Sequence, residues 1–319
     1  ISPVSEERTK ATQFRVVFDS LGTLCVGAFA TPLVELLGGG DEVAGFRATI
    51  ILFAVLSALI FWVTFATTRE RVQQQQHHGS VRGDVTALLK NASWVVLVLT
   101  GILVVIGLIA RFASIVFYLK YYVGDAGTTV FLIFDRTAVL TSCGLIGQLF
   151  GALITPMLAS RFEKHHLMIG MNVLHAALLA ICYFIPPDNF GLITMVHSLG
   201  IMTFGVVITL LFSMYTDCSE YGEWLTGRQT AGLTVSASMF SLKFGSALGG
   251  ALPGFMLAGF GFVANEVQSD WALQGIRLMF NGLPAVFFLA GGLLMLFYKI
   301  DRETLAVTER ELHERRTSS

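Results

Sequence analysis

Long apolar runs separated by short polar segments make up most of the chain. Eight of these runs are long enough to cross the hydrocarbon core of a bilayer as a helix, which takes about 20 residues. They lie at residues 14–37, 45–66, 93–122, 131–158, 166–185, 190–214, 231–258 and 274–298. The pattern predicts an all-α membrane protein, a helical bundle with about eight transmembrane helices.

The longest polar segment separates the first two predicted helices from the other six. It carries charged residues, a run of glutamines and the adjacent pair His77 and His78. A metal site needs more ligands at fixed spacing, so we interpret this segment as a solvated linker. The sequence then divides into a helix pair at 1–66, a central cytoplasmic loop at 67–92, a six-helix bundle at 93–300 and a cytoplasmic tail at 301–319.

Lysine and arginine collect on one side of the predicted membrane. If the N-terminus is cytoplasmic, the outer turns at residues 38–43, 123–130, 186–189 and 261–271 contain neither residue. Cytoplasmic loops of membrane proteins carry an excess of both. We therefore expect an integral protein of the bacterial inner membrane, surrounded by lipid, with both termini in the cytoplasm.

Composition narrows the possible functions. The chain is 54% hydrophobic and 13% charged, against about 25% charged residues in soluble domains. A net charge of −1 argues against nucleic acid as a partner. The chain contains no phosphate-binding loop, HExxH or GxSxG motif, so we do not expect an enzyme.

Charged residues inside the apolar runs are the first candidates for a transport pathway, because a charge at bilayer depth costs several kcal/mol. Lys243 is the only charge between Leu233 and Gly250. A lysine near a helix end can snorkel to the interface, but Lys243 lies near the middle of its run, which favours a position facing a cavity. Arg111 lies deep in the third run and is also a candidate for solute contact.

Arg15 and Asp19 are four residues apart on the first predicted helix, so they share one face. Two interpretations stay open for this pair. The side chains pair with each other, or they contact a polar solute. We include both among the candidate substrate-binding residues.

A dense polar stretch follows the sixth run and carries Asp217, Glu220, Glu223 and Arg228. One interpretation is a solvated helix end and turn. The other is a cytoplasmic gate, in which these carboxylates pair with basic residues across two bundles in one transport state and release them in the other. Arg228 is the natural charge partner nearby.

Uncharged residues suggest how the helices pack. Glycines recur at four-residue spacing in the pairs Gly147/Gly151, Gly245/Gly249 and Gly250/Gly254. Such pairs let helix backbones approach closely. The polar residues Gln148, Asn172, His175 and His197 are expected to form hydrogen bonds between helices.

The region from Asp217 to Gly250 resembles the glycoside–pentoside–hexuronide:cation symporters, the melibiose-carrier group of the major facilitator superfamily. The matching residues are Asp217, the segment Glu220–Trp224, Thr226–Arg228, Phe240–Lys243 and Gly245–Gly250. Further similarities are Arg15 with Pro32 and Leu37–Asp41, Thr68–Arg71, Tyr121–Asp125 and Arg161–Lys164, so the resemblance extends over nearly the whole chain.

The resemblance implies a twelve-helix carrier of which this chain supplies helices five to twelve. It implies contact with sugar for Arg15, a place near the cation and sugar sites for Lys243, and gating roles for Asp217, Glu220 and Glu223. It implies no cofactor, but a coupling Na⁺ or H⁺ whose main site lies outside this chain. We therefore expect residues 1–319 alone not to carry out coupled transport.

The hypothesis is a secondary active transporter that couples a cation to a small-molecule solute, a sugar or glycoside, by alternating access. The first alternative within transport is an exporter or importer of another small molecule on the same scaffold. The alternative from another class is an inactive truncated carrier or a membrane sensor that does not transport.

Overall fold

The computed structural model describes residues 5–68, 81–124, 129–131, 134–227 and 231–317. Its long helices are α1 (Ser5–Gly38), α2 (Glu42–Thr67), α4 (Ala92–Phe117), α5 (Arg136–Arg161), α6 (Lys164–Phe184), α7 (Phe190–Thr226) and α8 (Ala231–Gly259). A last membrane helix is built from α9 (Asp270–Arg277), a π-helical turn η2 (Leu278–Gly282), α10 (Leu283–Leu294) and a 3₁₀ turn η3 (Met295–Phe297). This confirms the all-α fold.

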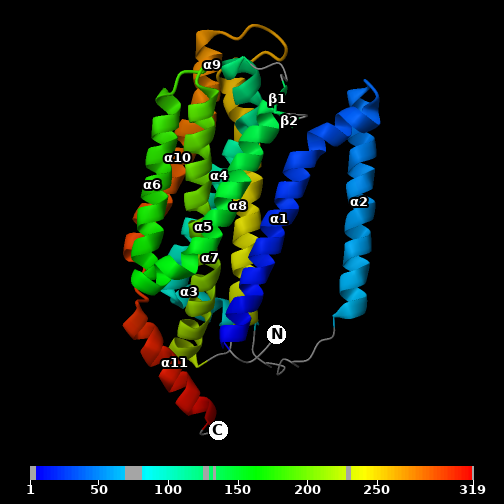
Figure 1. Cartoon of the computed structure of the whole chain (residues 1–319). Coiled ribbons are helices and arrows are strands. Elements are labelled where there is room, and N and C mark those ends of the chain that lie inside the picture. Colours follow the sequence, from blue (N-terminus) through cyan, green and yellow to red (C-terminus); the bar gives the residue numbers. More distant parts are fainter. Residues whose placement is uncertain (1–4, 69–80, 125–128, 132–133, 228–230, 318–319) are drawn as a thin grey trace.

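Seven of the helical segments in the described ranges are long and apolar enough to cross a membrane. They match seven of the eight predicted runs. The remaining run, 231–258, forms α8, a helix of 29 residues. Glycine, serine and alanine are frequent in α8, which packs against α4 and α7 (Figure 1).

Several polar segments are helical where the sequence predicts loops. α7 continues twelve residues beyond the predicted end at residue 214, so Asp217 to Trp224 are helical rather than part of a turn. It ends at Gly227, whose φ of 65° is readily available to glycine. The predicted central loop contains α3 (Val81–Lys90), the predicted tail contains α11 (Arg302–Thr317), and η1 (Tyr118–Val123) extends α4 as a π-helix.

A small antiparallel hairpin is the remaining regular structure in the described ranges. It consists of β1 (Thr129–Phe131) and β2 (Phe134–Asp135). It directly precedes α5, whose first turn is capped because the Asp135 carboxylate accepts a hydrogen bond from the Ala138 amide at 2.8 Å.

The helices from α4 onward form one bundle, with α1 lying along α5 and α2 packed on α1 to one side (Figure 1). The largest buried cluster joins α4, α6, α7 and α10, and Leu97, Met168, Leu210 and Phe288 are fully buried within it. Most apolar side chains of α2, such as Trp62 and Phe65, are exposed. This exposure fits a helix whose faces are covered by lipid or by further protein.

Glycines bring α5 and α7 into backbone contact. A Cβ atom on Gly147 would collide with the carbonyl of Ser198, and one on Gly151 with the carbonyl of Met202. From the other side, a Cβ on Gly205 would collide with the carbonyl of Gln148. The predicted packing role of Gly147 and Gly151 is confirmed.

The second predicted glycine pair brings α8 close to α4. A Cβ on Gly245 would lie 2.9 Å from the Ile102 carbonyl oxygen, and one on Gly249 would lie 2.7 Å from that of Ile106. The packing role of the third pair stays a prediction. Gly250 and Gly254 lie on the exposed side of α8, where no described helix approaches them closely.

We predict that Gly151→Ala destabilises the bundle by about 1–3 kcal/mol, the usual cost of forcing an extra carbon into a packed contact. The measurement is the melting temperature of the purified protein in detergent. The matched control is Gly170→Ala in α6, because no atom outside its own helix lies within 4 Å of the new Cβ. Equal melting temperatures for the two variants would contradict the packing role of Gly151.

Candidate functional site

An open cavity of about 690 Å³ lies between α1 and the helices α4, α5 and α7, and Phe18, Asp19 and Val26 on its α1 side are exposed. It is lined by side chains from all four helices: Phe18, Asp19, Gly22, Thr23, Val26, Gly27, Leu108, Ile109, Phe112, Thr141, Leu145, Gln148 and Phe204. The volume is typical of small-molecule sites, which combine apolar walls with a few polar groups that orient the ligand. Of the predicted substrate-binding residues, the lining includes Asp19.

The polar groups of the cavity are available to a solute. Among the described residues, neither the Asp19 carboxylate nor the Gln148 amide has a protein hydrogen-bond partner. Thr23 donates its hydroxyl proton to the backbone carbonyl of Asp19 at 2.9 Å, which leaves that carboxylate unused. Gln148, predicted to bond another helix, lines the cavity instead.

Arg15 lies one helical turn before Asp19 in α1, as predicted. Its side chain lies outside the described part of the structure. The proposed Arg15–Asp19 pair and the proposed contact of Arg15 with a solute therefore stay predictions.

Arg111 is buried inside the bundle with 1% of its surface exposed. Its Nη1 donates to the Phe280 carbonyl at 2.5 Å and to the Asn281 amide oxygen at 2.9 Å, and its Nη2 donates to His197 Nδ1 at 3.1 Å. The guanidinium also lies 3.9 Å from the centre of the Phe280 ring. Arg111 therefore ties α4 to α7 and to the π-helical turn η2.

These contacts fix the proton positions of two buried histidines. Arg111 can only donate, so His197 Nδ1 accepts and the proton of the neutral ring lies on Nε2. The Thr203 hydroxyl donates to the Gly200 carbonyl at 2.6 Å, so it accepts from His175 Nδ1 at 2.8 Å. Both histidines bond a neighbouring helix as predicted, whereas Asn172 donates to Met168 within α6.

Arg111 lies behind the residues that line the cavity and is not itself part of the lining. Leu108 and Phe112, its neighbours on α4, line the cavity, while the guanidinium bonds Phe280, Asn281 and His197. His197 in turn lies against α5 at Gly144, where an added Cβ would be 2.6 Å from Nε2. In this structure Arg111 positions the wall, and its predicted contact with solute remains a prediction.

Asp217 forms an ion pair at one end of the bundle. Its carboxylate accepts from Lys164 at 2.6 Å, and Lys164 also donates to the Ser213 hydroxyl at 3.0 Å. The pair joins α7 to the start of α6 within the same bundle. Glu220 and Glu223 follow on the last turns of α7, while Arg228 lies outside the described residues.

Other contacts fasten the same end of the bundle. Asn91 caps α4 and donates to the Cys218 carbonyl at 2.9 Å. The Trp224 indole donates to Glu311 of α11 at 2.8 Å, and Arg302 at the start of α11 donates to the Phe162 carbonyl at 2.7 Å. α11 thus connects the end of α7 to the turn between α5 and α6.

Lys243 projects from the exposed side of α8, opposite the glycine contact with α4. Within the described part of the chain, its ammonium has no hydrogen-bond or ion-pair partner. It does not line the cavity that contains Asp19. The structure therefore brings Asp19 together with Gln148 but leaves Arg111 and Lys243 outside that lining.

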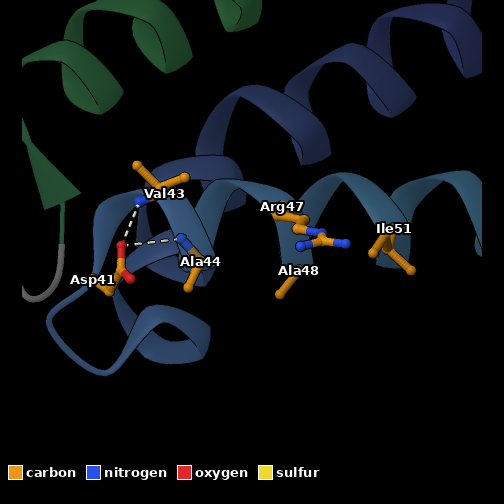
Figure 2. A pocket seen from close by; sticks show the side chains of 6 residues that line it. All are labelled: Asp41, Val43, Ala44, Arg47, Ala48 and Ile51. Atoms are coloured by element: carbon orange, nitrogen blue, oxygen red, sulfur yellow. Dashed lines mark hydrogen bonds between the residues drawn. The ribbon is translucent and has the colours of Figure 1, made fainter.

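A second hollow lies at the turn between α1 and α2 (Figure 2). Its one carboxylate, Asp41, accepts hydrogen bonds from the amides of Val43 and Ala44 at 2.9 and 3.2 Å. These bonds cap the first turn of α2. Helix capping accounts for Asp41, and we assign no ligand to this hollow.

Comparison with known proteins agrees with these observations. Residues 1–302 match the family model described as MFS/sugar transport protein. The chain is 32% identical to the isoprimeverose transporter of Lactiplantibacillus pentosus over 93% of this chain and 61% of that protein. It is 26% identical to the putative glycoside/cation symporter YagG of Escherichia coli (98% and 67% covered) and 27% identical to a glucuronide carrier protein homolog of the same species (92% and 63%).

The chain spans between 61% and 67% of the length of these three relatives. All three are named as carriers or transporters, which agrees with the resemblance to glycoside:cation symporters and with the prediction of a transport protein rather than an enzyme. Together with the membrane-spanning bundle, the match over residues 1–302 shows that the chain belongs to the MFS/sugar transport protein family.

Proposed function

We propose that this chain forms part of a secondary active transporter that couples uptake of a sugar or glycoside to a cation by alternating access. The observation that carries the proposal is the cavity between α1, α4, α5 and α7, which offers an unpaired carboxylate and amide beside aromatic rings. Asp19 is exposed in this structure, and ionisable residues within membrane helices commonly mark solute pathways. The family supports a sugar as the solute.

The ion pair between Asp217 and Lys164 is a contact that a gate could break and form again during transport. Alternating access moves one bundle against another around a central site and rearranges ion pairs at its ends. We propose that Asp217, Glu220, Glu223 and Arg228 form the gate, and that Lys164 holds Asp217 in the described state. Burial raises the cost of leaving either charge unpaired, so the pair favours one state until another partner replaces it.

We further propose that the coupling ion is Na⁺ or H⁺ and binds mainly outside this chain, as the family resemblance implies. The proposed location is the bacterial inner membrane with both termini in the cytoplasm, on the distribution of lysine and arginine. The rival hypothesis of an inactive carrier or a sensor receives no support from the relatives, which are named as transporters or symporters.

The first test of the proposed function is uptake into proteoliposomes by the protein expressed from its complete reading frame. We expect an inward Na⁺ or H⁺ gradient to accumulate a radiolabelled glycoside above its external concentration. An ionophore that collapses the gradient is the control and should abolish accumulation. Binding of glycosides without any uptake would favour the sensor.

For the topology, we predict that cysteines placed at Phe162 and Asn189 label from opposite sides of the membrane. These positions flank α6 and are both exposed. The measurement uses a membrane-impermeant maleimide on whole cells, after replacement of Cys25, Cys143, Cys182 and Cys218. Only Asn189 should react from outside, and labelling of both positions from one side would contradict the topology.

Arg111→Met should lower the melting temperature markedly, because the Phe280 carbonyl, Asn281 and His197 each lose a donor. An unsatisfied buried acceptor costs about 1–3 kcal/mol. The melting temperature of Arg111→Lys should lie between those of wild type and Arg111→Met, since an ammonium keeps the charge but lacks the planar arrangement of donors in a guanidinium. Arg47→Met at an exposed position of α2 is the control, and an unchanged melting temperature for Arg111→Met would contradict the positioning role.

Lys243→Leu should impair coupled uptake far more than membrane insertion, because we expect the ammonium to face the central cavity of the assembled carrier. Lys243→Arg should restore little, since the guanidinium is larger and does not release its proton. Lys90→Leu, at an exposed lysine outside the membrane helices, is the control. Uptake near the wild-type level by Lys243→Leu would show that coupled uptake does not need Lys243, as expected of a lysine that only snorkels to the membrane interface.

A further inference from the structure

We propose that the segment between α8 and α9, residues 260–269, is a strap that keeps the end of α8 attached to α4 throughout the transport cycle. The strap lies at the end of the bundle opposite the C-terminus, the outer end in the proposed topology, and docks on η1, which extends α4 (Figure 1). Its positioning residues are Phe262, Asn265 and Tyr121. The inference goes beyond the proposed function, because it states which helices stay in contact while the carrier moves.

A bend-prone position in α8 explains why a restraint matters there. Pro253 lies inside the helix and has no N–H to donate to the Gly249 carbonyl, and helices bend most readily at such positions. The glycine contact with α4 lies before the proline, since a Cβ on Gly249 would be 2.7 Å from the Ile106 carbonyl oxygen. The part of α8 from Pro253 to Gly259 lies beyond both, so it needs a separate attachment to stay on α4.

The way in which α8 ends directs Phe262 back toward the bundle. Gly261 has a φ of 69°, and its N–H donates to the Ala258 carbonyl at 3.2 Å. The Phe262 N–H donates to the Leu257 carbonyl at 3.0 Å. These two bonds form a Schellman motif, in which the residue after the glycine packs back on the last turn of the helix. Phe262 and Leu257 accordingly both pack against the buried apolar cluster at this end of the bundle.

Aromatic contacts attach Phe262 to the end of α4. The centre of its ring lies 5.5 Å from that of Phe117 and 5.0 Å from that of Tyr121, and both pairs are edge to face. This arrangement is favourable because the positive edge of one ring meets the negative face of the other. Phe117 is the last residue of α4 and Tyr121 lies in η1, so Phe262 contacts both sides of the junction between them.

Two hydrogen bonds hold the next part of the strap on the same turn. The Asn265 N–H donates to Tyr121 Oη at 3.0 Å, and Lys120 Nζ donates to Asn265 Oδ1 at 2.8 Å. Asn265 has a φ of 62°, a conformation that asparagine adopts more readily than most residues. The Gln268 side chain bonds both the N–H and the carbonyl of Val263, which stabilises the strap internally.

The glycine contact and the strap together make α4 and α8 one rigid unit. The first fixes the distance between the helices near Gly249, and the second fixes it again beyond Pro253, so their outer ends neither separate nor change their angle. Alternating access moves rigid parts of a carrier against one another. We therefore expect the outer end to open between this unit and the rest of the carrier, and not by bending of α8 at Pro253.

The first test cross-links the strap to η1. Lys120→Cys and Asn265→Cys, both at exposed positions, are combined in the protein expressed from its complete reading frame, after replacement of the native cysteines, and joined by a short bis-methanethiosulfonate. Glycoside uptake into proteoliposomes should stay within about twofold of that of the untreated variant, because a contact that persists through the cycle restricts no required motion. The two single-cysteine variants, treated in the same way, are the controls.

Hydrogen exchange in nanodiscs tests the attachment without relying on uptake. Tyr121→Phe removes the oxygen that accepts from Asn265, so amides of residues 260–269 should exchange several-fold faster. Tyr122→Phe, in the same turn η1, is the matched control and should leave their exchange unchanged. Equal exchange of this segment in wild type and Tyr121→Phe overturns the role of Tyr121.

Phe262→Ala tests the restraint on α8 itself. Residues 254–259, beyond Pro253, should exchange several-fold faster, whereas residues 242–249, which the glycine contact holds, should not change. Phe255→Ala is the matched control, because that ring lies on the same part of α8 and is 77% exposed. Equal exchange of residues 254–259 in wild type and Phe262→Ala overturns the inference.

The outcomes separate this inference from the proposed function. Uptake that the cross-link abolishes and a reducing agent restores overturns the inference and leaves the proposed function standing. A lack of glycoside uptake by the wild-type protein counts against the proposed function, and the exchange of residues 254–269 then decides whether the strap holds α8.

Discussion

The close approach of α5 to α7 is the contact on which the cavity and its surroundings depend. Gly147, Gly151 and Gly205 allow the two backbones to touch, which turns the adjacent side of α5, with Thr141 and Gln148, toward α1. The same approach places His197 of α7 against Gly144. His197 then accepts from Arg111, and Arg111 fixes the part of α4 that carries Leu108 and Phe112. A side chain at any of these glycines would move three walls of the cavity together.

Arg111 shows how a bundle accommodates a buried charge with neutral partners. Its described hydrogen-bond acceptors are a backbone carbonyl, an amide oxygen and an imidazole nitrogen. The carbonyl belongs to Phe280 in η2, a π-helical turn, and such turns disturb the regular helical bonding and are frequent at functional sites. The aromatic face of Phe280 adds a favourable contact with the cation.

The sequence predicted the helices well because their apolar runs are long and their ends are marked by polar residues. It also identified Gly147, Gly151, Gly245 and Gly249, since close helix contacts need small residues at four-residue spacing. It placed Asp19 among the candidate solute contacts, and the structure puts Asp19 in a cavity lining. These predictions succeed because each one rests on a residue pattern within a single helix.

Other features depend on which helices become neighbours. The sequence offered Arg228 as a charge partner at the proposed gate, whereas the described partner of Asp217 is Lys164, 53 residues earlier. The sequence around residues 278–282 does not indicate the π-helical turn whose residues bond Arg111. The sequence around Gln148 likewise does not show whether its amide lines a cavity or bonds a neighbouring helix. The polar residues after position 214 suggested a turn, but contacts with Asn91 and Glu311 hold them as helix.

The central claim is that the cavity between α1, α4, α5 and α7 holds the transported sugar. The most direct measurement is a structure of the protein, expressed from its complete reading frame, with a bound glycoside. The account predicts density for the sugar in this cavity, with hydroxyl groups within hydrogen-bond distance of Asp19 and Gln148. A sugar bound elsewhere in the bundle, with this cavity filled by side chains or lipid, would contradict it.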